Sequence, residues 1–163
     1  MTAPPTIHAS AVLVGARAVL IRGASGSGKS GLVLDLLQAA QSGLLSFARL
    51  VADDRAQVEA SNGRLLVRPA KALAHLLEVR GLGISKVEAE PVAVVGLVVD
   101  LAAEDAERLP QARATQTTIE GIRLPRLAVA SGQAPLPLVL ALLQTPRGSD
   151  PPPDPAPAAV AKK

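Results

Sequence analysis

Short apolar runs separated by glycines open the chain and predict two strands followed by a helix. Residues 11–14 and 18–21 are apolar and flank Gly15-Ala16-Arg17, which is typical of two strands joined by a tight turn. Residues 29–40 then carry leucine and valine at the spacing of one helix face. Between the second strand and this helix lies a glycine-rich segment, so the order of elements is that of a phosphate-binding loop.

The middle of the chain predicts further strands and one more helix. Residues 49–52 form an apolar run that ends in Asp53-Asp54, and a right-handed crossover places this strand beside the strand before the glycine-rich segment, in parallel. Residues 57–60 and 64–67 flank Asn62-Gly63, which is a hairpin signal. Residues 69–77 predict a helix with Pro69 near its start.

The last part of the pattern predicts a central strand, two shorter strands and a final helix. The valine-rich run 92–99 is typical of a strand buried on both faces. Residues 119–124 and 127–129 predict strands broken by Pro125, and residues 136–143 predict the last helix. Because residues 146–163 contain six prolines and few residues able to form a core, we expect a folded domain over 1–145 and a disordered tail over 146–163.

Composition narrows the class of protein. The chain has 163 residues, 48% of them apolar and only one aromatic, Phe47, so its core is built from aliphatic side chains. The net charge of +3 comes with no dense basic run and no stacking aromatics, which argues against nucleic acid as a partner. Cysteine is absent, and neither a membrane-spanning run nor a signal-peptide pattern is visible, so we expect a cytoplasmic protein.

The strongest chemical signal is the stretch GASGSGKS at residues 23–30. Its glycines allow the backbone N–H groups to curl around a phosphate, where a side chain would block the approach. Lys29 is then placed to reach the outer phosphates, and the Ser30 hydroxyl is placed to ligate Mg²⁺. The spacing predicts nucleotide binding, and the alternative is a plain glycine turn between a strand and a helix.

Other candidate residues are ambiguous by themselves. Asp53-Asp54 either ends a strand and begins a turn, or supplies a Mg²⁺ ligand and a base for an attacking hydroxyl. His8 precedes the first strand, where a histidine is usually a surface residue. Glu78 and Arg80 precede two glycines, which fits a capped helix end with a solvated ion pair as well as a backbone that approaches a ligand closely.

Four segments in this order resemble the HPr kinase/phosphorylases, a family of bacterial P-loop protein kinases. They are His8 before a strand, GASGSGKS at 23–30, RLVADDR at 49–55 and LLEVRGLGI at 76–84, and the last resembles the family's signature. The resemblance covers roughly residues 8–110 and is to the short form of the family, without an added N-terminal domain. It implies an α/β fold with a P-loop core, in which helices flank a mixed β-sheet.

The resemblance also implies roles for individual residues. Asp54 would accept the proton of the substrate serine, with His8 and Asp53 assisting, while Ser30 and Glu78 would ligate Mg²⁺. Lys29 would stabilise the phosphoryl group in transfer, and Arg80 and Arg108 would be further catalytic residues. The ATP phosphates would be bound by Gly23, Ala24, Ser25, Gly26, Ser27, Gly28, Lys29 and Ser30.

The implied activity is the ATP- and Mg²⁺-dependent phosphorylation of a serine on HPr or an HPr-like phosphocarrier protein by a homo-oligomer, commonly a hexamer in the family. The family also runs the reverse, phosphate-dependent reaction that yields pyrophosphate. Residues 129–137 correspond to a loop that carries arginine in the family and carry none here, which favours the kinase direction. Two alternatives stay open: a P-loop kinase of a small molecule, and a nucleotide-binding module without catalysis, which Gly31 in place of the family's glutamate would suit.

Overall fold

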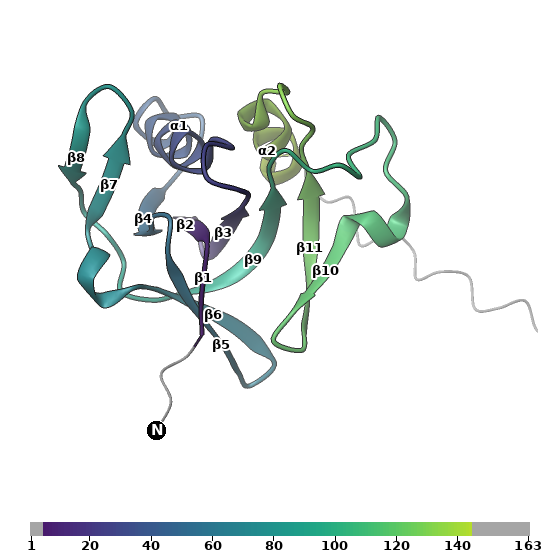
Figure 1. Ribbon diagram of the computed structural model, residues 1–163, viewed down its shortest axis with the longest axis horizontal. Helices are drawn as coiled ribbons and strands as arrows, with labels where there is room; N and C mark the ends of the chain where they lie inside the picture. The colour runs from purple at the N-terminus through teal and green to yellow at the C-terminus, as the bar shows by residue number, and fades with distance from the viewer. Residues whose placement is uncertain (1–4, 145–163) are drawn as a thin grey trace, which may run out of the picture.

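The computed structural model of the protein describes residues 5–144, which form a curled nine-stranded mixed sheet with helices above it and a separate two-stranded hairpin (Figure 1). The strands of the large sheet follow the order β1-β5-β6-β9-β3-β2-β4, with β11 also paired to β9 and β10 paired to β11. The fold is therefore α/β, as expected. The elements are β1 (Thr6–Ile7), β2 (Ala9–Val14), β3 (Arg17–Arg22), α1 (Lys29–Gln41), β4 (Ala48–Ala52), β5 (Ala56–Ser61), β6 (Arg64–Pro69), β7 (Leu76–Val79), β8 (Gly83–Lys86), β9 (Ala93–Asp100), β10 (Gln116–Ile119), β11 (Ile122–Ala128) and α2 (Pro135–Gln144), with short 3₁₀ turns at Lys71–Leu73 and Ala112–Thr115.

The predicted strand pair and helix at the start of the chain are confirmed. Strands β2 and β3 pair antiparallel from Val14↔Arg17 to Ala9↔Arg22, and the turn between them uses Gly15 with a φ of 62°. Helix α1 begins at Lys29, directly after the glycines, and buries one apolar face. The glycine-rich loop, residues 23–28, thus joins the end of β3 to the start of α1.

The predicted place of the strand before Asp53 is wrong in one respect. Strand β4 does not lie beside β3, because β2 lies between them and pairs antiparallel with both. Strand β4 still runs in the same direction as β3, so its carboxyl end does reach the side of the sheet where the glycine-rich loop lies. The crossover rule assumes that the two parallel strands are neighbours, and here the β2–β3 hairpin had already filled that position.

The hairpin at Asn62-Gly63 is confirmed, and the helix predicted over 69–77 is wrong. Strands β5 and β6 pair across a turn in which Asn62 and Gly63 have φ values of 51° and 76°. Pro69 ends β6, and after a single 3₁₀ turn the chain enters β7. His75, the residue before β7, has a φ of 67°, which no helix contains, and the pairing of β7 with β8 overrides the local helical propensity.

The valine-rich strand is confirmed as β9, which lies between β3 and β11 and is parallel to both. The break predicted at Pro125 is wrong, because β11 continues through it and the hairpin turn lies at Glu120-Gly121. Pairing between β11 and β9 begins only at Arg126, so the missing N–H of Pro125 costs no hydrogen bond to β9. The final helix is confirmed as α2.

Two clusters of aliphatic side chains form the core on opposite faces of the sheet. One contains the buried faces of α1 and α2 together with Val19, Ile21 and Val99, and the other is built from strands alone, with Leu20, Val58 and Val98 at its centre. No helix within residues 5–144 is long and apolar enough to cross a membrane. The tail predicted over 146–163 lies outside the described residues.

Candidate functional site

The glycine-rich loop requires glycine for its backbone conformation at two positions and for space at a third. Gly26 and Gly28 have φ values of 83° and 102°, which L-residues rarely adopt. A Cβ atom on Gly23 would lie 2.3 Å from the Oγ of Ser27, which is buried beneath the loop without a hydrogen-bond partner in the described residues. The N-terminus of α1 follows at once, so free backbone N–H groups and the positive end of the helix dipole face the same place.

Lys29 is folded back over this loop. Its side chain is only 6% exposed, and its Nζ donates hydrogen bonds to the carbonyl oxygens of Gly23 at 2.8 Å and Ala24 at 3.2 Å. The same Nζ lies 3.9 Å from Oδ1 of Asp54. The ammonium group therefore stands between the loop and the acidic pair.

Asp53 is buried and joins three separate elements. Its Oδ1 accepts hydrogen bonds from Ser30 Oγ of α1 at 2.7 Å and from Ser10 Oγ of β2 at 2.9 Å. Its Oδ2 accepts a hydrogen bond from the backbone N–H of Glu78 in β7 at 3.1 Å. The carboxylate thus fixes the Ser30 hydroxyl and ties the β7–β8 hairpin to the main sheet.

Asp54, the second of the pair, is exposed. Its backbone has a φ of 64°, a strained value for a non-glycine residue, and is held there from both sides. Asp54 donates its N–H to Ser10 Oγ at 3.0 Å, and its carbonyl oxygen accepts the N–H of Ala9 at 3.1 Å. The side chain is 58% exposed, so it is open to a molecule that approaches Lys29.

A groove of about 390 Å³ gathers most of the residues singled out from the sequence. It is lined by the glycine-rich loop, Lys29, Ser30, Asp54, Glu78 and Arg80. A second hollow of about 480 Å³ lies on the other side of the loop, against residues 129–133 and the start of α2. The loop thus has accessible space on both sides.

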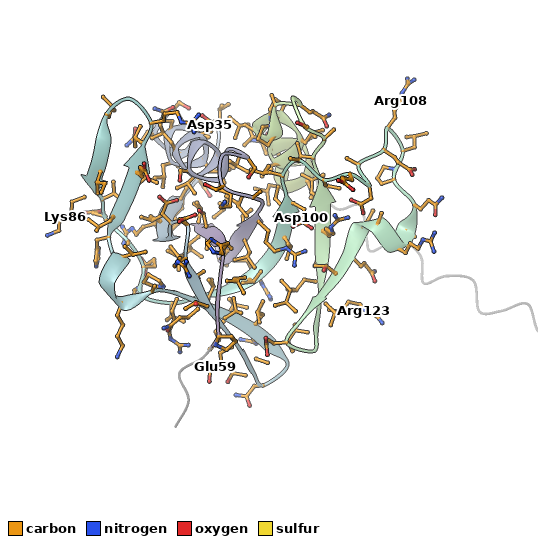
Figure 2. The ribbon with its side chains drawn as sticks, in the orientation of Figure 1. Asp35, Glu59, Lys86, Asp100, Arg108 and Arg123 are labelled. Atoms are coloured by element: carbon orange, nitrogen blue, oxygen red, sulfur yellow. The ribbon has the colours of Figure 1, made fainter. Side chains whose placement is uncertain are left out.

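Two predicted residues lie apart from this groove. His8 is exposed between β1 and β2. Its link to the groove is the next residue, Ala9, whose N–H bonds to the carbonyl oxygen of Asp54. Arg108 is exposed on the loop that follows β9, and Figure 2 shows it pointing away from the sheet and helices. Arg108 does not line the groove in this chain.

The oxygen atoms in the groove suit Mg²⁺. Ser30 contributes a hydroxyl and Glu78 a carboxylate to the lining of the groove, and Asp53 is buried behind them with its Oδ1 bound to the Ser30 hydroxyl. No cluster of three His, Cys, Asp or Glu side chains forms anywhere in residues 5–144. Magnesium is usually held by one or two carboxylates together with phosphate oxygens, so this sparse donor set fits a metal that arrives with a nucleotide.

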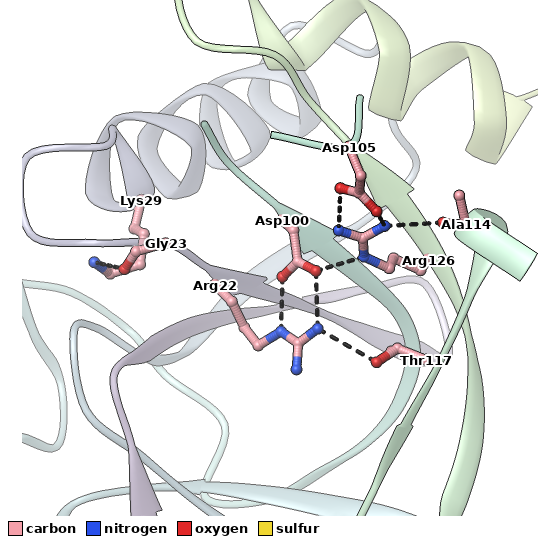
Figure 3. A network of polar contacts seen from close by, with 8 residues as sticks. All are labelled: Arg22, Gly23, Lys29, Asp100, Asp105, Ala114, Thr117 and Arg126. Carbon is pink, nitrogen blue, oxygen red and sulfur yellow. Dashed lines mark hydrogen bonds and ion pairs between the residues drawn. The ribbon is translucent and has the colours of Figure 1, made fainter. Parts of the chain in front are cut away.

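On the opposite flank of the loop, two arginines enclose Asp100 (Figure 3). Arg22, the last residue of β3, binds both oxygens of Asp100 at 2.7 and 2.8 Å, and Arg126 binds Oδ2 at 2.6 Å. Burial alone raises the pKa of Asp100, but the hydrogen bonds and charges of the two arginines outweigh it and hold the pKa below its usual range. Arg126 also binds Asp105, so the loop after β9 is tied to the same network.

Sequence reasoning missed Ser10, Arg22, Asp100 and Arg126. Ser10 was detectable as the one hydroxyl in an otherwise apolar strand, close to His8. Arg22 and Asp100 each end a strand, and the parallel register Arg22↔Asp100 places them side by side. That register is a product of the fold, so the sequence by itself did not reveal the pair.

Comparisons with known proteins agree with this geometry. The family model described as HPr Serine kinase C-terminal domain matches residues 1–139. An HPr kinase/phosphorylase of Limosilactobacillus reuteri (strain DSM 20016) is 34% identical over 136 residues, which cover 76% of this chain and 40% of that protein. An HPr kinase/phosphorylase of Streptococcus thermophilus (strain CNRZ 1066) is 44% identical over 80 residues, 48% of this chain and 24% of that protein.

The solved structure of the Hpr(Ser) kinase/phosphatase from Coxiella burnetii has the same fold. It matches with a TM-score of 0.68 at 22% identity and covers 86% of this chain and 88% of that one. The chain spans less than half the length of the curated relatives it matches. Together with the arrangement of the glycine-rich loop and the acidic pair, the match over residues 1–139 shows that this chain belongs to the HPr serine kinase C-terminal domain family.

Proposed function

We propose that this chain transfers a phosphoryl group from ATP to a serine hydroxyl of HPr or an HPr-like phosphocarrier protein. The observation that carries the proposal is the position of Asp54, exposed at the groove and 3.9 Å from Lys29. Phosphoryl transfer asks a protein mainly for positioning and positive charge, together with a group that accepts the proton of the nucleophile. Lys29 supplies the positive charge, and Asp54 is the group that accepts the proton.

Each residue then has a distinct part. The glycine-rich loop and the N-terminus of α1 bind the phosphates, and Lys29 moves from the carbonyl groups of Gly23 and Ala24 to the negative oxygens. ATP with Mg²⁺ supplies the phosphoryl group and neutralises part of its charge. Asp54 accepts the serine proton as the serine oxygen bonds to the γ-phosphorus and the bond from that phosphorus to the leaving ADP breaks.

Asp53 has a positioning part in this proposal. It holds the Ser30 hydroxyl at 2.7 Å and the backbone N–H of Glu78 at 3.1 Å, and so positions Ser30 and Glu78, the two residues that would receive Mg²⁺. Arg80 lines the same groove and adds positive charge near the phosphates. The second hollow, on the far side of the loop, offers room for the nucleoside. The hexameric state, the cytoplasmic location and the catalytic role of Arg108 stay predictions.

The test is transfer of label from γ-labelled ATP to the serine of purified HPr. Wild-type protein is expected to label HPr with Mg²⁺ and not with EDTA. Asp54→Asn is expected to lose 100-fold or more, about the contribution of a general base, while its ATP affinity is retained. Glu59→Gln, an exposed carboxylate far from the loop in Figure 2, is the matched control and is expected to keep full activity.

Three outcomes would contradict the proposal. Label that appears on HPr at the wild-type rate with Asp54→Asn would show that Asp54 does not accept the serine proton. ATP binding without any transfer to HPr by the wild-type protein would favour a nucleotide-binding module without catalysis. Transfer to a small molecule alone would favour a small-molecule kinase.

A further inference from the structure

A hollow of about 740 Å³ lies where two strands diverge from β9. Strand β6 pairs with Ala93 and Val94, and β11 pairs with β9 only from Val98 onward. Val95 and Leu97 are paired with β3 alone, and Gly96 between them is skipped by a bulge in the β3–β9 register. We call the gap between β6 and β11 along β9 the fork. The hollow occupies this gap, and the last turn of α2 closes it on one side.

Three arginines line the fork, one from the first residues of each surrounding strand. They are Arg17 of β3, Arg64 of β6 and Arg123 of β11, which Figure 2 labels on the β10–β11 hairpin. All three are exposed, and within residues 5–144 none of their guanidinium groups has an ion-pair or hydrogen-bond partner. No aspartate or glutamate lines the hollow. Other arginines of the same sheet, such as Arg22 and Arg68, are paired with carboxylates.

The close packing of Arg17 on Gly96 shows that this arrangement is built into the sheet. A Cβ atom on Gly96 would lie 2.7 Å from the Cβ of Arg17 and 3.0 Å from its Cδ. The aliphatic stem of Arg17 therefore lies directly on the β9 backbone, and only glycine leaves room for it. A side chain held by its stem has less freedom to lose when its head group binds an anion.

The floor of the hollow is apolar. Val19, Leu97 and Leu124 line it and are almost fully buried, and Leu142 and Leu143 of α2 form a half-exposed rim. Guanidinium groups bind phosphates and carboxylates in a bidentate manner, while an apolar floor of this size accommodates the body of a small organic molecule. The arginines and the apolar floor together favour a ligand that carries an anionic group on an apolar body.

We propose that this fork is a second binding site, for a small organic anion with phosphate or carboxylate groups on an apolar body. The site is separate from the groove at the glycine-rich loop. Arg17 and Gly23 lie at opposite ends of β3, roughly 20 Å apart at the rise of an extended strand. The inference does not depend on kinase activity, because it rests on charges and space at the other end of the sheet.

Fluorescence titration with 2-naphthyl phosphate and 2-naphthoate tests the proposal on the full chain, with saturating ATP and Mg²⁺ present to occupy the loop. Saturable binding of at least one probe is expected, and the stronger one tells phosphate from carboxylate. Arg17→Gln and Arg64→Gln are each expected to weaken that binding about tenfold or more, as loss of a charge-assisted hydrogen bond does. Arg113→Gln removes an exposed arginine outside the fork and is expected to change nothing.

The proposal is overturned if neither probe binds in the millimolar range, which is also the result expected if another part of the chain fills the fork. It is equally overturned if both fork variants bind like the wild type, or if a probe binds in a parallel titration without ATP and that binding is lost when saturating ATP and Mg²⁺ are present. Each variant's unfolding midpoint is measured in parallel, so that a folding defect in one of them leaves the other to decide.

Discussion

Replacing Ser10 by alanine is the sharpest test of how the acidic pair is held. Ser10 Oγ donates to Asp53 Oδ1 at 2.9 Å and accepts the N–H of Asp54 at 3.0 Å, and the side chain is fully buried. The substitution removes both hydrogen bonds at once. Asp53 keeps its hydrogen bonds from Ser30 and from the N–H of Glu78, so its buried carboxylate is held less firmly but still has partners.

The expected cost follows from the kinds of bond that are lost. A buried hydrogen bond to a charged group contributes about 1.5–3 kcal/mol. The hydrogen bond from the Asp54 N–H is part-buried and joins two neutral groups, so its loss costs less than the loss of the bond to the Asp53 carboxylate. We therefore expect Ser10→Ala to lower the free energy of unfolding by about 2 kcal/mol, which for a domain of this size lowers the Tm by roughly 4–8 °C.

The assay is urea and thermal unfolding followed by circular dichroism, with Ser46→Ala as the matched control. Ser46 is exposed, and its hydroxyl makes no hydrogen bond within the described residues, so that variant is expected to stay within about 0.5 kcal/mol of the wild type. If Ser10→Ala unfolds at the same urea concentration as Ser46→Ala, then the hydroxyl does not hold the pair and the reasoning is refuted. Ser10 Oγ also accepts one of the two hydrogen bonds that hold Asp54 at its strained φ of 64°. Because its loss lets Asp54 move, phosphoryl transfer is expected to fall as well.

Two further substitutions test the flanks of the loop. Gly23→Ala places a methyl group 2.3 Å from Ser27 Oγ, so calorimetry is expected to show ATP binding about tenfold weaker, while Ser46→Ala, which lines neither hollow beside the loop, is expected to leave it unchanged; equal affinities would contradict the packing argument. Because the pKa of Asp100 is lowered in the folded state, its stabilisation is present above the unfolded pKa of about 4 and is lost as pH falls through the folded value. Asp100→Asn is therefore expected to lower stability at pH 7 and to flatten the loss of stability below about pH 4, and an acid limb as steep as the wild type's would show that other carboxylates cause it.

Local signals predicted the parts of this fold that depend on neighbours in sequence. The β2–β3 hairpin, the glycine-rich loop and α1 are consecutive, and their turn and helix patterns agree with one another. The helix predicted over 69–77 failed because its apolar residues are used differently. Leu77 is buried in the main core while the N–H of Glu78 binds Asp53, and both require an extended strand at this place.

The sequence predicted which residues meet at the candidate site, but not which of the two aspartates is buried and which is exposed. The sequence placed Asp53 and Asp54 near Lys29 and Ser30, and the structure brings these four residues together. Nothing in two adjacent aspartates tells which one turns inward. That choice is made by Ser10 on β2, whose hydroxyl faces the end of β4 only because β2 pairs with that strand.

The position of β2 between β3 and β4 also explains how the groove stays open. Neighbouring strands lie about 4.8 Å apart, so the interposed strand sets the ends of β3 and β4 roughly 10 Å apart. Were β4 directly beside β3, its two carboxylates would lie against the backbone N–H groups of the glycine-rich loop and repel any phosphate there. With β2 in between, they instead meet the first turn of α1, where Asp53 binds Ser30 and Asp54 approaches Lys29. The carboxylates are thereby kept off the N–H groups of the loop, of which only that of Ser27 is bonded within it, to Ala24, while an acidic group stays within reach of a bound anion.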